Sequence, residues 1–151
     1  DLCSLAARAF FHPETNGSNS IKQVLPAVLK ISDFLRRTYT QPVYGAPNGM
    51  PSKNFSSENG FVWIESPDKD CDPYKRLKQM SEAQLAGADG EGSAIADGGA
   101  AATAYARLQF EDMSDYERTE IQKAVLKYLE LNSMARVMIY EGWVDLLSVR
   151  Q

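Results

Sequence analysis

A long helical pattern in the last third of the sequence constrains the fold more than any other feature. Apolar residues recur there at the spacing of one helix face, at Ile121, Ala124, Val125, Tyr128, Ala135, Met138 and Ile139. Ser114 followed by Glu117 three residues later fits a capping box, which marks a helix start. The pattern predicts one helix over residues 115 to about 147 with one buried stripe. Gly142 is expected to loosen its end.

Shorter helical patterns precede this one. Residues 2–11 have helical periodicity, and "DPYKRLKQM" reads as a short basic helix. Ser20 with Gln23 fits a capping box for the run that contains a proline. Either residue of the Ser32-Asp33 pair can cap the next helix, and Asp97 can cap a later helix rich in alanine.

The middle of the chain reads as loop with a small β element. Residues 38–66 are rich in proline and glycine, and Asn59-Gly60 lies between aromatic and β-branched residues, which predicts a β-hairpin. The whole chain, residues 1–151, is then one domain or domain fragment with a loop-rich insertion at about 38–66. The predicted fold class is mostly α with a small β-hairpin, that is, α+β.

Composition narrows the classes of function. The net charge of -4 gives no general attraction to nucleic acid. Cys3 and Cys71 make no disulfide framework, so a reducing cytoplasm is expected, and with one histidine they give no zinc-ligand pair. No apolar run approaches the ~18 residues of a membrane span. His12, the single imidazole, is expected to bond the backbone of its own loop.

Two acidic segments resemble ligand-binding loops only superficially. Residues 68–72, "DKDCD", begin like a calcium loop, but Pro73 and Gln79 stand where such a loop needs glycine and glutamate. A solvated turn is the better interpretation. "GADGEG" has no preceding strand and no following Gly-Lys, which indicates a linker and not a phosphate site.

Basic residues form two short clusters, Arg36 with Arg37, and Lys75, Arg76 and Lys78. Together they are candidates to contact a nucleic-acid backbone. Three basic residues in four positions are more often a solvated helix face, so that interpretation is retained beside the first.

Tyr128 and Asn132 are the candidate catalytic residues. Four residues apart, they share one helix face. The last motif of the DEDD superfamily of 3′–5′ exonucleases is Tyr-x-x-x-Asp on such a helix, where the aspartate helps to hold two divalent cations. A core tyrosine and a polar residue near the helix edge explain the pair equally well.

Longer stretches carry a resemblance. "HPETNGSNSIKQVLPAV", "DPYKRL" and "DGGAAATAYARLQFEDMSDYERTEIQKAVLKYLELNSMARVMIYEGW" resemble, in matching order, the C-terminal part of the bacterial family called domain of unknown function 2779. The resemblance implies an RNase H-like exonuclease fold, often behind a RecB-like nuclease domain. It also implies that Tyr128 orients the attacking water and that Asn132 occupies the position of the last catalytic acid.

Two departures from the family pattern shape the function hypothesis. The family's "YCELDTLAMV" is "YLELNSMARV" here, so a neutral amide replaces the acid, and no segment expected to be a strand carries the family's Asp-x-Glu motif. We therefore expect a degenerate or truncated nuclease that is inactive as this chain and holds no metal. A Mg²⁺-dependent hydrolase of DNA or RNA would need an aspartate at 132 and acids from upstream segments or a protein partner.

The alternative is a non-catalytic helical module. It would bind a protein partner through the buried stripe of the long helix and through the small-residue helix, without chemistry. The sequence does not choose between DNA and RNA, and it does not give the oligomeric state.

Overall fold

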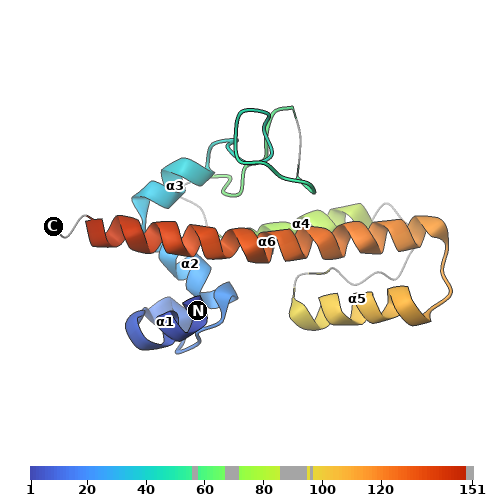
Figure 1. Cartoon of the computed structure of the whole chain (residues 1–151), viewed down its shortest axis with the longest axis horizontal. Helices are drawn as coiled ribbons and strands as arrows, with labels where there is room; N and C mark the ends of the chain where they lie inside the picture. Colours follow the sequence, from blue (N-terminus) through green and yellow to red (C-terminus); the bar gives the residue numbers. More distant parts are fainter. Residues whose placement is uncertain (56–57, 67–71, 86–94, 96, 149–151) are drawn as a thin grey trace. The chain divides into compact units, whose positions relative to one another are not determined.

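The computed structural model describes residues 1–55, 58–66, 72–85, 95 and 97–148, most of which are helical (Figure 1). The elements are α1 (Leu2–Ala9), the 3₁₀ turn η1 (Pro13–Thr15), α2 (Ile21–Ile31), α3 (Asp33–Tyr39), α4 (Pro73–Leu85), α5 (Gly98–Phe110) and α6 (Asp115–Ser148). They divide into two compact units. The first comprises Asp1–Pro73 and Asn132–Gln151, and the second comprises Tyr74–Leu131.

The predicted α+β class with a β-hairpin is wrong, because the described residues contain no β-strand. They form isolated bridges instead, in which Tyr44 pairs with Met50 and with Phe61. Gly60 has a φ of +72° and approaches Pro42 so closely that a Cβ would lie 2.3 Å from the Pro42 carbonyl oxygen. The turn therefore brings Phe61 back to Tyr44, and among the described residues this pairing does not extend into a β-ladder. The RNase H-like fold implied by the resemblance is not supported either.

The loop after α3 is held by aromatic side chains. The rings of Tyr44, Phe55, Phe61 and Trp63 form tilted and edge-on pairs with centroids 4.8–6.2 Å apart. Such a cluster supplies apolar burial where the backbone has little regular hydrogen bonding. The loop thus has a small core of its own within the first unit.

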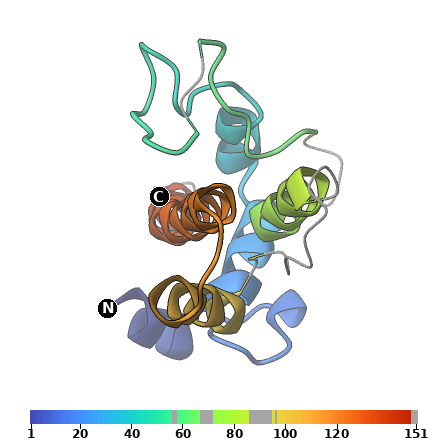
Figure 2. The same ribbon diagram turned by 90° about the vertical axis from the view of Figure 1, so that its right-hand side faces the viewer.

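The long C-terminal helix is confirmed, and α6 runs from Asp115 to Ser148. Gly142 does not loosen it. A Cβ at Gly142 would lie 2.5 Å from Val28 Cγ1 and 2.7 Å from Leu35 Cδ1, so the glycine allows α2 and α3 to approach the C-terminal part of α6 (Figures 1 and 2). A glycine at position 142 thus permits close packing of the three helices.

The caps of α2 and α3 differ from each other. Ser32 caps α3 as predicted, and its Oγ accepts a hydrogen bond from the Leu35 amide at 3.2 Å. Ser20 stands at the N-cap of α2, but its side chain makes no capping hydrogen bond. The capping box predicted for Ser20 and Gln23 is therefore wrong.

In the second unit, α5 lies beside the N-terminal part of α6 (Figure 1). Arg118 Nη1 donates to the Leu108 carbonyl at 2.7 Å, and Arg107 forms an ion pair with Glu117 at 3.0 Å. Ser114 accepts from the Glu117 amide, as one half of the predicted capping box requires. The Glu117 carboxylate binds Arg107, which ties the two helices together.

Candidate functional site

The two candidate catalytic residues lie on α6 and belong to different units. Tyr128 belongs to the second unit and is 5% exposed, whereas Asn132 is the first residue of the C-terminal segment of the first unit and is partly exposed. Their spacing on a helix is as predicted. Their role in a reaction stays a prediction.

Tyr128 lies next to the start of α5. A Cβ at Gly98 would be 3.7 Å from the Tyr128 hydroxyl oxygen, and Asp97 caps α5 by accepting from the Ala100 amide at 2.7 Å. Two parts of the resemblance, "DGGAAATAY" and "VLKYLEL", therefore approach each other within the second unit, at Gly98 and Tyr128. A methyl group at position 98 would be in ordinary van der Waals contact with the phenol.

The described residues do not fit a magnesium site. No group of three or more histidine, cysteine, aspartate or glutamate side chains gathers among residues 1–55, 58–66, 72–85, 95 and 97–148. Two-metal hydrolysis needs several carboxylates around the ions. "DKDCD" lies outside the described residues except for Asp72, and "GADGEG" lies wholly outside them.

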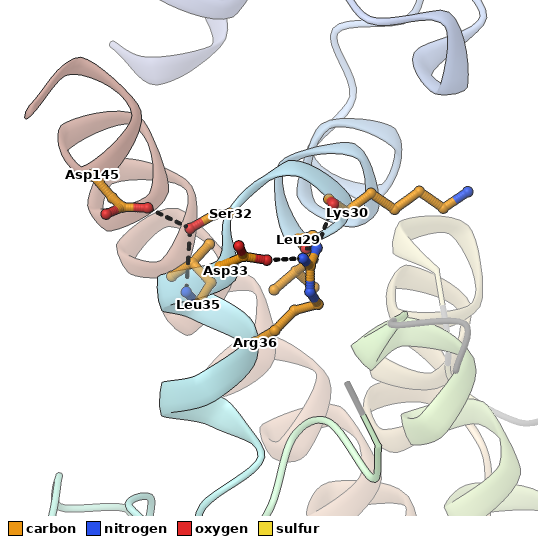
Figure 3. A network of polar contacts seen from close by, with 7 residues as sticks. All are labelled: Leu29, Lys30, Ser32, Asp33, Leu35, Arg36 and Asp145. Carbon is orange, nitrogen blue, oxygen red and sulfur yellow. Dashed lines mark hydrogen bonds and ion pairs between the residues drawn. The ribbon is translucent and has the colours of Figure 1, made fainter. Parts of the chain in front are cut away.

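Arg36 serves the fold in this structure (Figure 3). Its guanidinium donates to the Leu29 carbonyl at 2.9 Å, to the Lys30 carbonyl and to the Asp33 carboxylate. A cation at the last carbonyls of a helix satisfies acceptors that have no partner within it and opposes the negative end of the helix dipole. Arg36 thus stabilises the sharp turn between α2 and α3.

The other basic candidates belong to different units. Arg37 is exposed on α3, in the first unit, whereas Lys75, Arg76 and Lys78 lie on α4, in the second. Lys75 is exposed, Arg76 is partly buried, and Lys78 forms an ion pair with Glu82 at 3.8 Å. No single basic surface is described, so contact with a nucleic acid stays a prediction.

His12 behaves as expected of a loop histidine. Its Nδ1 accepts a hydrogen bond from the Glu14 amide at 3.3 Å and so caps η1. Phe10 stacks near its ring at a centroid distance of 6.3 Å. The imidazole has a local structural role.

A cavity of about 280 Å³ lies in the first unit between α1, the start of α2 and α6. Its lining is mainly apolar and includes Ile21, Val24, Ile139 and Trp143, with Arg136 at its polar side. The lining holds neither a histidine nor a pair of carboxylates.

The C-terminal part of α6 carries apolar side chains on two opposite faces. Ala135, Met138 and Ile139 are buried, so this part of the predicted stripe is occupied within the chain. Four residues face away from that core at 41%, 61%, 45% and 68% exposure, and we call them the exposed stripe: Val137, Tyr140, Val144 and Leu147. The sequence pattern was interpreted as one buried face, so these four residues were not predicted. Their spacing of three, four and three residues could have indicated a second apolar face.

Two polar contacts fix the rotation of α6 in the first unit. Ser32 Oγ donates to Asp145 Oδ2 at 3.0 Å (Figure 3), and the Tyr39 hydroxyl donates to Glu141 Oε2 at 2.6 Å. Burial, followed by the hydrogen bond to Glu141, raises the pKa of Tyr39 above its ordinary value of 10.0. With α2 and α3 held on one side, the exposed stripe is presented on the other as a preformed surface.

The comparisons with known proteins leave the family open. No family model matches the sequence, and neither the curated proteins nor the solved structures contain a significant match. The resemblance to domain of unknown function 2779 therefore stays a prediction from the residues.

None of the helices in the described part of the chain is both long enough and apolar enough to cross a membrane. This holds for α6 as well, whose 34 residues include many charges.

Proposed function

We propose that this chain is a non-catalytic helical module that binds a protein partner through the exposed stripe of α6. The exposed stripe itself carries the proposal. Apolar side chains aligned on one face of an anchored helix gain free energy when a partner removes them from water, at about 25 cal/mol per Å². Contiguous exposed apolar surface of this kind marks interaction sites.

The arrangement around the exposed stripe supports binding in preference to chemistry. Arg136 and Glu141 border it with opposite charges, as expected of a polar rim around an apolar centre. The buried stripe and the small-residue helix, which the sequence suggested as binding surfaces, are less suited. The buried stripe is already covered, and α5 exposes mainly alanine and threonine besides Tyr105 and Phe110. A cytoplasmic location belongs to the same proposal, because two isolated cysteines in the sequence are not the pattern of a disulfide-rich secreted domain.

The test replaces Val137 and Val144 by serine in one variant and captures partners from the source cell. Tyr116→Ser is the control, because Tyr116 is an exposed apolar residue of the same helix outside the stripe, at 65% exposure against 41% for Val137 and 45% for Val144. We expect the double variant to keep its melting temperature and to bind its partner at least about tenfold more weakly, as for the loss of interface anchors. The control should bind as the unmodified chain does. Equal capture by all three proteins would refute the proposal.

A second candidate function is that of a nuclease segment completed by another polypeptide. The proximity of Gly98 to the Tyr128 hydroxyl favours it, because two stretches of the resemblance come together there. The acids for Mg²⁺ would have to come from the other polypeptide, and Tyr128 and Asn132 would be this chain's site residues. DNA and RNA are both open as substrates, with Lys75 and Arg37 as exposed candidates for the backbone.

Asn132→Asp in the full-length or assembled protein tests this candidate. A carboxylate at the family position should raise Mg²⁺- or Mn²⁺-dependent degradation by at least about tenfold, because an anion binds a hard cation far better than an amide does. Ser133→Asp is the control, since it places the same charge one position around the helix. Unchanged turnover in Asn132→Asp, or an equal gain in the control, would count against a nuclease role.

A further inference from the structure

The exposed stripe has the spacing of a coiled-coil seam. Val137, Tyr140, Val144 and Leu147 follow one another at intervals of three, four and three residues, which is the a-d-a-d pattern of a heptad. In this register Val137 and Val144 are a positions, and Tyr140 and Leu147 are d positions. Upstream, the corresponding positions are Ser133 and Glu130, so the apolar seam is confined to residues 137–147.

The residue types at these positions specify the number of strands. Valine at a and leucine at d favour two parallel helices, because a β-branched side chain packs well at the a layer of a dimer. Both a positions of the seam are valine, and one of its two d positions is leucine. Tyr140 at the other d position can pack its ring in the seam and keep its hydroxyl at the solvent edge.

The charges beside the seam specify the orientation and the occupant. Arg136 is the g residue and Glu141 is the e residue of the same seam. In a parallel pair, g of one helix lies beside e of the next heptad on the other helix, so Arg136 of each copy meets Glu141 of the other. In an antiparallel pair, g meets g and e meets e, which brings like charges together. The chain is therefore complementary to itself in the parallel orientation.

Both charged groups can reach a second copy. Arg136 is exposed, and among the residues described it has no ion-pair partner. Glu141 is partly exposed, and its Oε2 atom accepts a hydrogen bond from the Tyr39 hydroxyl. The carboxylate can therefore accept a further hydrogen bond from a guanidinium without giving up the contact that anchors α3.

We infer that the partner of the exposed stripe is a second copy of this chain, bound as a short parallel two-helix coiled coil over residues 136–147. This inference rests on the proposed binding function and names its partner. The seam spans fewer than two full heptads, so the dimer exchanges with monomer and forms at high concentration.

Sedimentation of the full chain tests the inference. Between about 10 μM and about 1 mM, a range suited to a weak complex, the mass should rise from 16.8 kDa toward twice that value. Arg136→Glu should raise the dimer dissociation constant at least about fivefold through repulsion from Glu141. Mixing Arg136→Glu with Glu141→Lys should restore dimer formation, because each mixed pair is then attractive.

A second measurement covers the case in which Glu141→Lys does not fold. Val144→Cys, made with Cys3 and Cys71 replaced by serine, should form a disulfide between copies, because equal a residues face each other only in the parallel pair. Monomer at every concentration overturns the inference. So does a dimer that neither responds to Arg136→Glu nor forms a disulfide in the Val144→Cys variant. If, in the capture experiment, the variant with Val137 and Val144 replaced by serine loses binding of a protein other than this chain, the proposed function stands, and only the identity of the partner is wrong.

Discussion

At the scale of single residues, two side chains that can carry chemistry stabilise the fold. Arg36 closes the end of α2, and His12 caps a 3₁₀ turn. The role of His12 follows from its place beside proline and could be predicted. That of Arg36 could not, because its acceptors are created by the turn between α2 and α3, which a sequence pattern does not specify.

Caps show the same limit. Ser32 and Asp97 could be recognised because a capping hydrogen bond is local and involves a residue three positions away. Ser20 fits the same pattern but does not cap, since the pattern permits a hydrogen bond without requiring it.

Tyr39 gives a testable pH dependence. Its pKa is raised in the folded protein, so below pH 10.0 the phenol is neutral in both states and its contribution to stability is fully present. Above that pH the unfolded chain loses its proton first. The free energy of unfolding should then fall by up to about 1.4 kcal/mol per pH unit from this group.

Tyr39→Phe should remove that alkaline component and, near neutral pH, cost about 1–3 kcal/mol for the lost bond to Glu141. Urea unfolding at about pH 7 and at pH values above 10 measures both effects. Tyr116→Phe is the control, because Tyr116 is 65% exposed. Identical alkaline slopes in the unmodified chain and in Tyr39→Phe would contradict a raised pKa of Tyr39 in the folded protein.

At the scale of elements, α6 could be predicted almost to the residue. Its periodicity and its start at Ser114 are properties of one contiguous segment. Its second apolar face was missed because a periodicity argument assigns one face to the core and treats the rest as solvated. The packing role of Gly142 was not predicted for a related reason. Glycine has low helix propensity, so a glycine within a helix indicates local instability unless the neighbouring side chains are known.

Gly142→Ala tests this packing role. Alanine gains about 1 kcal/mol of helix propensity over glycine. The new methyl group, however, collides with the fully buried Val28 and Leu35, and overpacking of this kind costs about 1–3 kcal/mol. We expect a net loss of stability in thermal unfolding. Ser133→Ala, on the exposed side of α6, is the control and should be neutral or slightly stabilising. A more stable Gly142→Ala protein would contradict the close approach of α2 and α3.

At the scale of the whole molecule, the helical framework was predictable and the β element was not. Asn59-Gly60 has the composition of a hairpin turn, but the fold returns Phe61 to Tyr44 and packs the loop around aromatic rings. Pairing between distant segments is not encoded in a turn alone. The proposed binding surface depends on the same level of organisation, because Val137, Tyr140, Val144 and Leu147 form an exposed stripe only once α2 and α3 have covered the other side of α6.

The central claim is that this face of α6 contacts another protein. A photoreactive phenylalanine at position 140, compared with the same group at position 116, tests it most directly in the source cell. Both positions are exposed tyrosines of α6, at 61% and 65% exposure, and only Tyr140 belongs to the exposed stripe. The account predicts a discrete crosslinked protein, a second copy of the chain included, from position 140 and none from position 116. No crosslink at 140, or equal crosslinking at both positions, would contradict it.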